Sequence, residues 1–293
     1  MFRLTPSVLF PALGETMSER SGVYNVGLEG YMLMGALTGY LGTYLTGNLA
    51  VGMLFGILTG MALSALHAYF VITHKANQIL SGIAIWIFGM GLSAYLFRAI
   101  NISSGVSTFE PVVIPGLSSI PGLGPVLFSQ NAMVYLVLVM AGVFWFILFK
   151  TPFGLITRAT GDNPLSVDIA GHNVFRIRYY NVLIAGAMAG MGGACMSLVT
   201  LNTFVENMVA GRGFVALALV IFGNWNPAMV LGAALIFTFV DALQINIQAA
   251  GSFIPYPFLL MLPYIVAMII LVFSGRKATG AAYLFIPYTK GQS

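Results

Sequence analysis

Three acidic residues, Glu15, Glu29 and Asp241, stand among apolar neighbours in the sequence and are the side chains best suited to chemistry. A carboxylate at hydrocarbon depth is costly unless it binds a proton, pairs with a cation or accepts hydrogen bonds. These residues are therefore candidates for solute contact or ion coupling. For Glu29, the alternative is a structural polar cluster with Glu19 and Arg20 that caps helix ends.

Amide and hydroxyl side chains accompany these acids. Gln244 and Gln248 follow Asp241 by three and seven residues, so the three share one helical face, turned either to a pathway or to a neighbouring helix. Asn77 and Ser81 stand at the start of an apolar stretch, where capping a helix is their alternative role. The candidates for a pathway or a polar cluster are Asn25, Glu29, Asn77, Gln78, Ser81, Asp241 and Gln244.

The polar segment 150–178 connects two apolar stretches and carries the signals of a short helix. Asn163 followed by Pro164 is a favoured helix start, and Gly171 suits the position after a helix end. We expect a helix of about two turns over 164–170. The side chains that it would expose to water are two acids together with Leu165, Val167 and Ile169. Such a helix is either a docking element for a cytoplasmic partner or an ordinary amphipathic connector.

Common catalytic and metal-binding motifs are missing from the sequence. It has no phosphate-binding G-x-x-x-x-G-K-[ST] loop, no H-E-x-x-H helix and no G-x-S-x-G turn. Its three histidines lack ligand spacing, and its single cysteine, Cys195, cannot form an intrachain disulfide. We expect neither enzyme activity nor a cofactor or metal ion on this chain.

The composition indicates which elements position these residues. The chain has 293 residues, of which 59% are hydrophobic and 7% charged, against about 25% charged in an ordinary soluble domain. Its mean hydropathy is +0.93. These values exclude a soluble enzyme and a disordered chain. The net charge of +4 comes from scattered cations without a basic stripe, so we expect no nucleic-acid partner.

We expect an all-α fold, a polytopic membrane helical bundle of about eight or nine transmembrane segments in a single domain over 1–293. A span needs about 20 apolar residues at 1.5 Å each. Two shorter apolar stretches, 5–17 and 213–223, predict broken or re-entrant half-helices. Glycines four residues apart, as in Gly35–Gly39 and Gly186–Gly190, predict close helix packing. The predicted spans are 26–46, 49–73, 78–100, 131–149, 179–201, 227–249 and 257–274.

The cations predict an orientation, because cytoplasmic loops carry an excess of Lys and Arg. Placing the segment 150–178 in the cytoplasm puts nine cations inside and three outside, with the C-terminus cytoplasmic. The loop 101–130 is then external, and its Pro and Gly content predicts a compact cap. The inside cations are Arg20, Lys75, Lys150, Arg158, Arg176, Arg178, Arg276, Lys277 and Lys290, and the outside ones are Arg3, Arg98 and Arg212.

Three stretches resemble the permease subunits of bacterial ATP-binding-cassette importers, in the branch that includes ribose, branched-chain amino-acid and nucleoside permeases. They are 19–36, 158–178 with its Gly161-Asp162-Asn163-Pro164 motif, and 211–227. The first and third look closest to nucleoside or simple-sugar permeases, and the second is shared across the branch. The resemblance implies a small polar solute, with a nucleoside as the first candidate and a simple sugar as the second.

The same resemblance implies partners and a location in the bacterial cytoplasmic (inner) membrane. It implies a heterodimer with a second homologous permease subunit, a cytoplasmic ATPase subunit that carries ATP and Mg, and an extracytoplasmic solute-binding protein. The ATPase would contact the helix over 164–170. The residues that would couple to it are Arg158, Asp162, Asn163, Pro164, Leu165, Asp168, Ala170 and Gly171.

An ion-coupled secondary transporter is the alternative function, with Glu29 or Asp241 as the coupling carboxylate. This alternative predicts solute uptake that stops when an ionophore removes the ion gradient, and that needs no ATPase. An intramembrane enzyme and a scaffold without transport have less support, since no catalytic pair is visible in the sequence.

Overall fold

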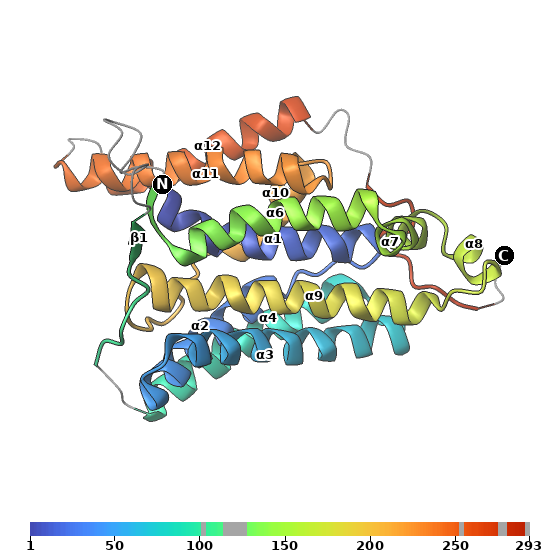
Figure 1. Ribbon diagram of the computed structural model, residues 1–293, viewed down its shortest axis with the longest axis horizontal. Helices are drawn as coiled ribbons and strands as arrows, with labels where there is room; N and C mark the ends of the chain where they lie inside the picture. Colours follow the sequence, from blue (N-terminus) through green and yellow to red (C-terminus); the bar gives the residue numbers. More distant parts are fainter. Residues whose placement is uncertain (101–103, 114–127, 252–254, 275–279, 291–293) are drawn as a thin grey trace.

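The computed structural model describes residues 1–100, 104–113, 128–251, 255–274 and 280–290. Within these ranges the chain is an elongated bundle of helices, with the N-terminus and the described segment 280–290 at opposite ends (Figure 1). This architecture confirms the all-α membrane bundle. The helices are α1 (Thr5–Arg20), α2 (Leu28–Thr46), α3 (Leu49–Ala68), α4 (Gln78–Ile100), α6 (Ala132–Lys150), α7 (Pro152–Asp162), α8 (Pro164–Ile169), α9 (Val174–Cys195), α10 (Arg212–Phe222), α11 (Pro227–Ala249) and α12 (Tyr256–Ser274).

Short helical turns and one pair of strands are the other regular elements of the described chain. A 3-10 turn over Phe2–Leu4 precedes α1, and π-helical turns continue α3 over Tyr69–Thr73 and α9 over Met196–Thr200. β1 (Pro111–Val113) pairs antiparallel with β2 (Ser129–Asn131). These strands belong to the loop predicted as a compact external cap, of which 101–103 and 114–127 lie outside the described residues.

Five helices in the described ranges are long and apolar enough to cross a membrane. The largest difference from the predicted starts is at α9, which begins at Val174 rather than at 179. The Asn173 side chain caps this earlier start, accepting a hydrogen bond from the Arg176 backbone N–H at 3.1 Å. The predicted spans 26–46 and 257–274 are also helical, as α2 and α12. The five spans are Leu49–Thr73, Gln78–Ile100, Ala132–Lys150, Val174–Thr200 and Pro227–Ala249.

The first helix, α1, is longer than predicted and lies inside the bundle. It continues past residue 17 to Arg20, because the polar side chains of its last turn have interior partners around Trp225. Its 16 residues extend over about 24 Å. Nearly all its side chains are buried against α6, α9, α10 and α11.

Glycines bring α2, α3 and α9 into close contact, as their spacing predicts. A Cβ added at Gly35 of α2 would lie 2.5 Å from the carbonyl oxygen of Gly190 in α9. A Cβ added at Gly56 of α3 would lie 2.8 Å from the Cβ of Ala194 and 3.0 Å from the carbonyl oxygen of Gly35. Helices in lipid associate through such close backbone packing. These three helices therefore form a rigid support for the polar residues.

Candidate functional site

The predicted short helix is present as α8, at the same end of the bundle as the described segment 280–290 (Figure 1). Asn163 Oδ1 accepts a hydrogen bond from the backbone N–H of Ser166 at 3.2 Å, and Pro164 is the first helical residue. Gly171 has a φ of +85°, the left-handed conformation that commonly follows a helix end. Ala170, expected inside the helix, is its C-cap.

The exposed face of α8 is narrower than predicted. Val167 is only 4% exposed and packs with Val174 and Tyr288, so the prediction that it faces water is wrong. Ile169 is 78% exposed and leaves the largest apolar surface of this helix open. Of the other predicted coupling residues here, Asp162, Asn163, Ala170 and Gly171 are exposed, Leu165 and Asp168 are half-buried and Pro164 is buried.

A second helix, α7, precedes α8 and was not predicted separately. Thr151 Oγ1 accepts a hydrogen bond from the Gly154 N–H at 3.2 Å, and Pro152 is the first helical residue. A capping side chain followed by proline also identified the start of α8, so the start of α7 could have been predicted from the sequence. Arg158 lies on α7 with its guanidinium carbon 5.1 Å from the centre of the Phe149 ring. That predicted coupling residue therefore lies on α7 and contacts a spanning helix.

The segment 280–290 packs along α8, and sequence reasoning missed it. The backbone N–H of Tyr283 donates to the carbonyl oxygen of Gly161 at 2.8 Å. The Tyr288 ring lies 5.7 Å from the Phe175 ring, and this residue closes the small apolar cluster under α8. Burial, and after it the Asp168 carboxylate, raises the pKa of Tyr288, so the tail docks through an uncharged phenol. Aromatic residues after the last span were the available signal.

Arg178 connects this tail to the interior of the bundle. Its Nη1 donates to the carbonyl oxygen of Ile286 and its Nε to the carbonyl oxygen of Ser21, both at 3.1 Å. A movement of α8 therefore has a bonded route, through the tail and Arg178, to the chain that follows α1.

Together α8 and the tail enclose a groove of about 220 Å³. Arg276 and Lys277, counted among the inside cations, lie outside the described residues. The groove gives the α8 end a surface made from two distant parts of the sequence. Its lining residues are Pro164, Leu165, Tyr283, Ile286, Pro287, Tyr288 and Thr289.

Tyr288→Ala should detach the tail, because the ring is the part of the segment that packs under α8. Deleting a buried aromatic side chain costs about 3–5 kcal/mol of stability. Losing even part of this free energy is enough to release a short segment from its docked position. We expect cleavage within 280–290 by a non-specific protease to become at least about tenfold faster, as followed by mass spectrometry. Lys290→Ala, at an exposed position of the same segment, should be cleaved at the wild-type rate.

The break between α1 and α2, residues 21–27, is folded around the predicted residue Asn25. The backbone N–H of Asn25 donates to Glu15 Oε1 at 2.9 Å. Its side-chain Oδ1 accepts from the Gly27 N–H at 3.0 Å and from the Tyr31 hydroxyl at 3.1 Å. Glu15 and Asn25 therefore satisfy the irregular backbone, which hydrocarbon alone cannot do.

A second break, 223–226 between α10 and α11, lies against the end of α1. Trp225 Nε1 donates to Glu19 Oε2. Arg20 donates from Nε to the carbonyl oxygen of Trp225 at 3.3 Å and from Nη2 to that of Asn224 at 3.2 Å. Glu19 and Arg20 thus hold the end of α1 against the break at 223–226.

Glu29 caps the start of α10, and its hydrogen-bond partners differ from those of Glu19 and Arg20, with which it was expected to form one cluster. Its Oε1 accepts from the Gly211 N–H at 2.8 Å and its Oε2 from the Gly213 N–H at 2.7 Å. A carboxylate at a helix N-terminus satisfies free N–H groups and complements the helix dipole. These two hydrogen bonds join Glu29 to glycines that lie 182 and 184 positions later in the sequence.

The residues at the start of α4 have three different partners. Asn77 Oδ1 caps α4, accepting from the N–H groups of its first turn at 3.0 and 3.1 Å. Gln78 Oε1 accepts from the Tyr24 N–H at 2.8 Å, which connects α4 to the break at 21–27. Ser81 Oγ is 3.1 Å from His67 Nδ1.

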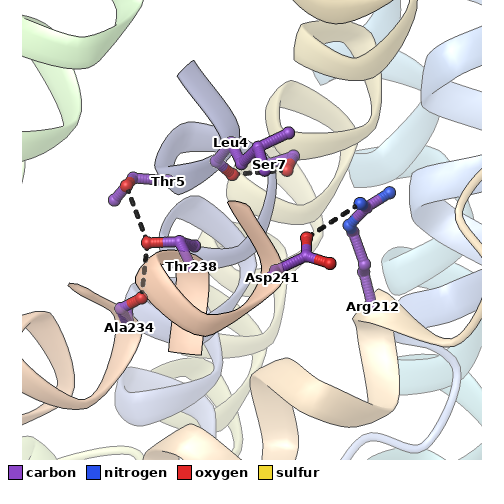
Figure 2. A network of polar contacts seen from close by, with 7 residues as sticks. All are labelled: Leu4, Thr5, Ser7, Arg212, Ala234, Thr238 and Asp241. Carbon is purple, nitrogen blue, oxygen red and sulfur yellow. Dashed lines mark hydrogen bonds and ion pairs between the residues drawn. The ribbon is translucent and has the colours of Figure 1, made fainter. Parts of the chain in front are cut away.

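Asp241 pairs with the residue that starts α10. Figure 2 shows Arg212 Nη2 reaching Asp241 Oδ2, at 3.2 Å, beside the bond of 3.1 Å between the Thr5 and Thr238 hydroxyls. Asp241 and Gln244 share one face of α11, as predicted, and line a cavity of about 120 Å³. The predicted site residues are thus distributed over the α8 end, the helix breaks with the start of α4, and the α10–α11 contact.

Comparison with known proteins places this arrangement in a family. Residues 1–275 match the family described as the permease component of the branched-chain amino acid transport system. The chain is 37% identical to the guanosine ABC transporter permease protein NupQ of Bacillus subtilis, covering 97% of this chain and 93% of that protein. It is 35% identical to the nucleoside ABC transporter permease protein NupC of Lactococcus lactis, covering 94% and 93%.

A third relative is named for a sugar. The putative glucose ABC transporter permease protein TsgC13 of Haloferax volcanii is 40% identical, covering 83% of this chain and 74% of that protein. No solved structure matches the chain. The family match extends over most of the sequence, including α8 and the Glu29 and Asp241 contacts. The chain therefore belongs to the permease-component family of the branched-chain amino acid transport systems, and it is a multi-pass membrane protein.

Proposed function

We propose that this chain forms part of the solute pathway of an ATP-binding-cassette importer and contacts a separate ATPase through α8. The observation that carries the proposal is α8 itself, which is capped at both ends, braced by α7 and the tail, and exposes Ile169. A helix held this rigidly can transmit a displacement from a partner subunit, whereas a flexible connector cannot. ATP and Mg belong to the partner ATPase, and this chain is a non-catalytic subunit.

The solute is a nucleoside, with a simple sugar as the second candidate. Two relatives named for guanosine or nucleosides match 94% or more of this chain, and the relative named for glucose matches 83% of it. Both solute classes are small, uncharged and rich in hydrogen-bonding groups. The membrane interior near Asp241 and Gln244 offers partners for such groups.

The working assembly contains a second homologous permease subunit and an extracytoplasmic solute-binding protein, in the bacterial cytoplasmic (inner) membrane. The α8 end faces the cytoplasm. Lys150, Arg176 and Lys290 lie in or beside the elements of this end, in keeping with the excess of cations in cytoplasmic segments. The described tail lies at that end too, so the C-terminus is cytoplasmic.

The mechanism is a two-state switch of the bundle that nucleotide biases. Closure of the ATPase dimer moves α8, and Val167 and Tyr288 pass the movement to the tail. Arg178 then moves the chain around Ser21, at the break between α1 and α2. The α2–α3–α9 support stays rigid, so the displacement concentrates at the helix breaks.

An ion-coupled mechanism fits the carboxylates less well. Both oxygens of Glu29 accept hydrogen bonds from backbone N–H groups of α10. Asp241 is paired with Arg212. A carboxylate that carries a proton or sodium ion must be able to exchange its partner, and these two have structural partners already.

Ile169→Asp tests the docking role of α8. The substitution places a charge on the exposed apolar face without touching the buried Val167 side, so the bundle should remain folded. A charge at the centre of an interface weakens it by at least about tenfold. We expect the ATPase to be lost on co-purification of the complex, together with ATP-driven uptake into proteoliposomes.

The matched control is Leu45→Asp, at the end of α2. Leu45 is 77% exposed and lies far from α8 along the bundle. This variant should retain the ATPase as the wild type does. Normal co-purification and uptake by the Ile169→Asp variant would refute the docking role.

A further inference from the structure

The cavity between α10, α11 and α12 has the composition of a binding pocket. Its volume is about 120 Å³, and its polar lining comes from Arg212, Asp241, Gln244 and Tyr264. Phe237 and Pro263 supply apolar surface. Phe237, Asp241 and Gln244 are spaced four and three residues apart, so one face of α11 carries all three.

Gln244 is the side chain that the fold does not explain. It is only 4% exposed, yet it makes no hydrogen bond to any part of the chain that the structure describes. Neither polar atom of its amide is among the fully enclosed atoms without a partner, so the amide is accessible and keeps unused hydrogen-bonding capacity. Its amide group lines the cavity, so a molecule within the cavity can supply the missing hydrogen bonds.

The neighbouring ion pair leaves hydrogen-bonding capacity on the same cavity. Arg212 uses Nη2 for Asp241 Oδ2, at 3.2 Å, and the guanidinium has further N–H groups. The two side chains are 21% and 14% exposed, so they are accessible from the cavity without being open to bulk solvent. The Tyr264 ring stands edge-on to the Phe237 ring, with centroids 6.4 Å apart, and forms an aromatic wall.

We propose that this cavity is a binding subsite for a hydroxyl-bearing ring, either a simple sugar or the ribose of a nucleoside. Each hydroxyl both donates and accepts, which matches an amide beside a guanidinium–carboxylate pair. The apolar face of such a ring packs against the aromatic wall. The cavity is smaller than the roughly 300–1,000 Å³ that encloses a complete ligand, so it holds one ring while the remainder of the solute lies outside it.

This inference rests on the proposed transport function for its ligand class, and Gln244→Leu tests it. Leucine fills a similar volume without hydrogen-bonding groups, so the variant should be as stable as the wild type or slightly more stable. Uptake of guanosine or glucose into proteoliposomes, with the full complex and its binding protein, should fall about fivefold to tenfold. Stabilisation of the purified permease–ATPase complex by either solute, measured as a thermal shift without binding protein, should disappear.

Gln248→Leu is the matched control, because Gln248 is an exposed glutamine one turn further along α11 and does not line the cavity. It should keep wild-type uptake and thermal shift. A Gln244→Leu complex that is still stabilised by the solutes as the wild type is would overturn the subsite. A wild-type complex without ATP-driven uptake would instead refute the proposed function, while the thermal shift still decides the subsite. Unfolding of the Gln244→Leu variant would show a structural role and also overturn it.

Discussion

Gly190→Leu is expected to prevent the chain from forming a stable bundle. A Cβ at Gly190 would collide with the carbonyl oxygen of Gly56 and lie 3.1 Å from the Cα of Gly60, both backbone atoms of α3. Backbone atoms cannot rotate aside, so the larger residue forces α3 and α9 apart. Overpacking usually costs about 1–3 kcal/mol, and we expect this change to cost at least about 3 kcal/mol. The measurement is loss of the monodisperse peak in size-exclusion chromatography in detergent.

Gly142→Leu is the control for that experiment. Gly142 lies in α6, and apart from its chain neighbours and the adjoining backbone of that helix, no atom in the described part of the chain lies within 4 Å of a Cβ added there. Both changes add the same side chain to an apolar helix, so membrane insertion is affected equally. Gly142→Leu should elute and melt as the wild type does. The same behaviour in Gly190→Leu would contradict the close α3–α9 packing.

Local signals predicted much of this fold because hydrophobic length and helix caps act over a few residues. The span 227–249 coincides with α11, since Asn226 and Pro227 mark its start. α8 was predictable for the same reason, from Asn163 and Pro164. The glycine spacing predicted close packing, although the partner of each glycine could not be inferred from spacing alone.

Contacts between distant parts of the chain were not predictable in this way. Val167 was expected in water because a single helix face cannot reveal that Tyr288, far along the chain, covers it. Likewise the capping of α10 by Glu29 depends on how two helices meet in the bundle. The sequence identified Glu29 and Asp241 as special through the cost of burying a charge, but not their partners.

Glu29→Leu should destabilise the chain and abolish uptake. Leucine leaves the N–H groups of Gly211 and Gly213 without their carboxylate partner, at a cost of about 1–3 kcal/mol each. Because Arg212 stands between those glycines, its pairing with Asp241 loses its fixed position as well. Thermal unfolding of the purified chain measures the loss. Glu110→Leu, at an exposed acidic residue, is the control and should melt at the wild-type temperature.

Glu29→Gln separates helix capping from ion coupling. Glutamine keeps one carbonyl oxygen for the α10 N–H groups, but it can neither bind nor release a proton. If Glu29 is a cap in an ATP-driven importer, the variant should retain uptake within about tenfold of the wild type, since one acceptor is lost. Uptake should require ATP and persist with an ionophore, both in the variant and in the wild type. If the chain is a proton-coupled carrier, the variant should lose uptake entirely, and the ionophore should stop uptake by the wild type. That result would refute the ATP-driven mechanism.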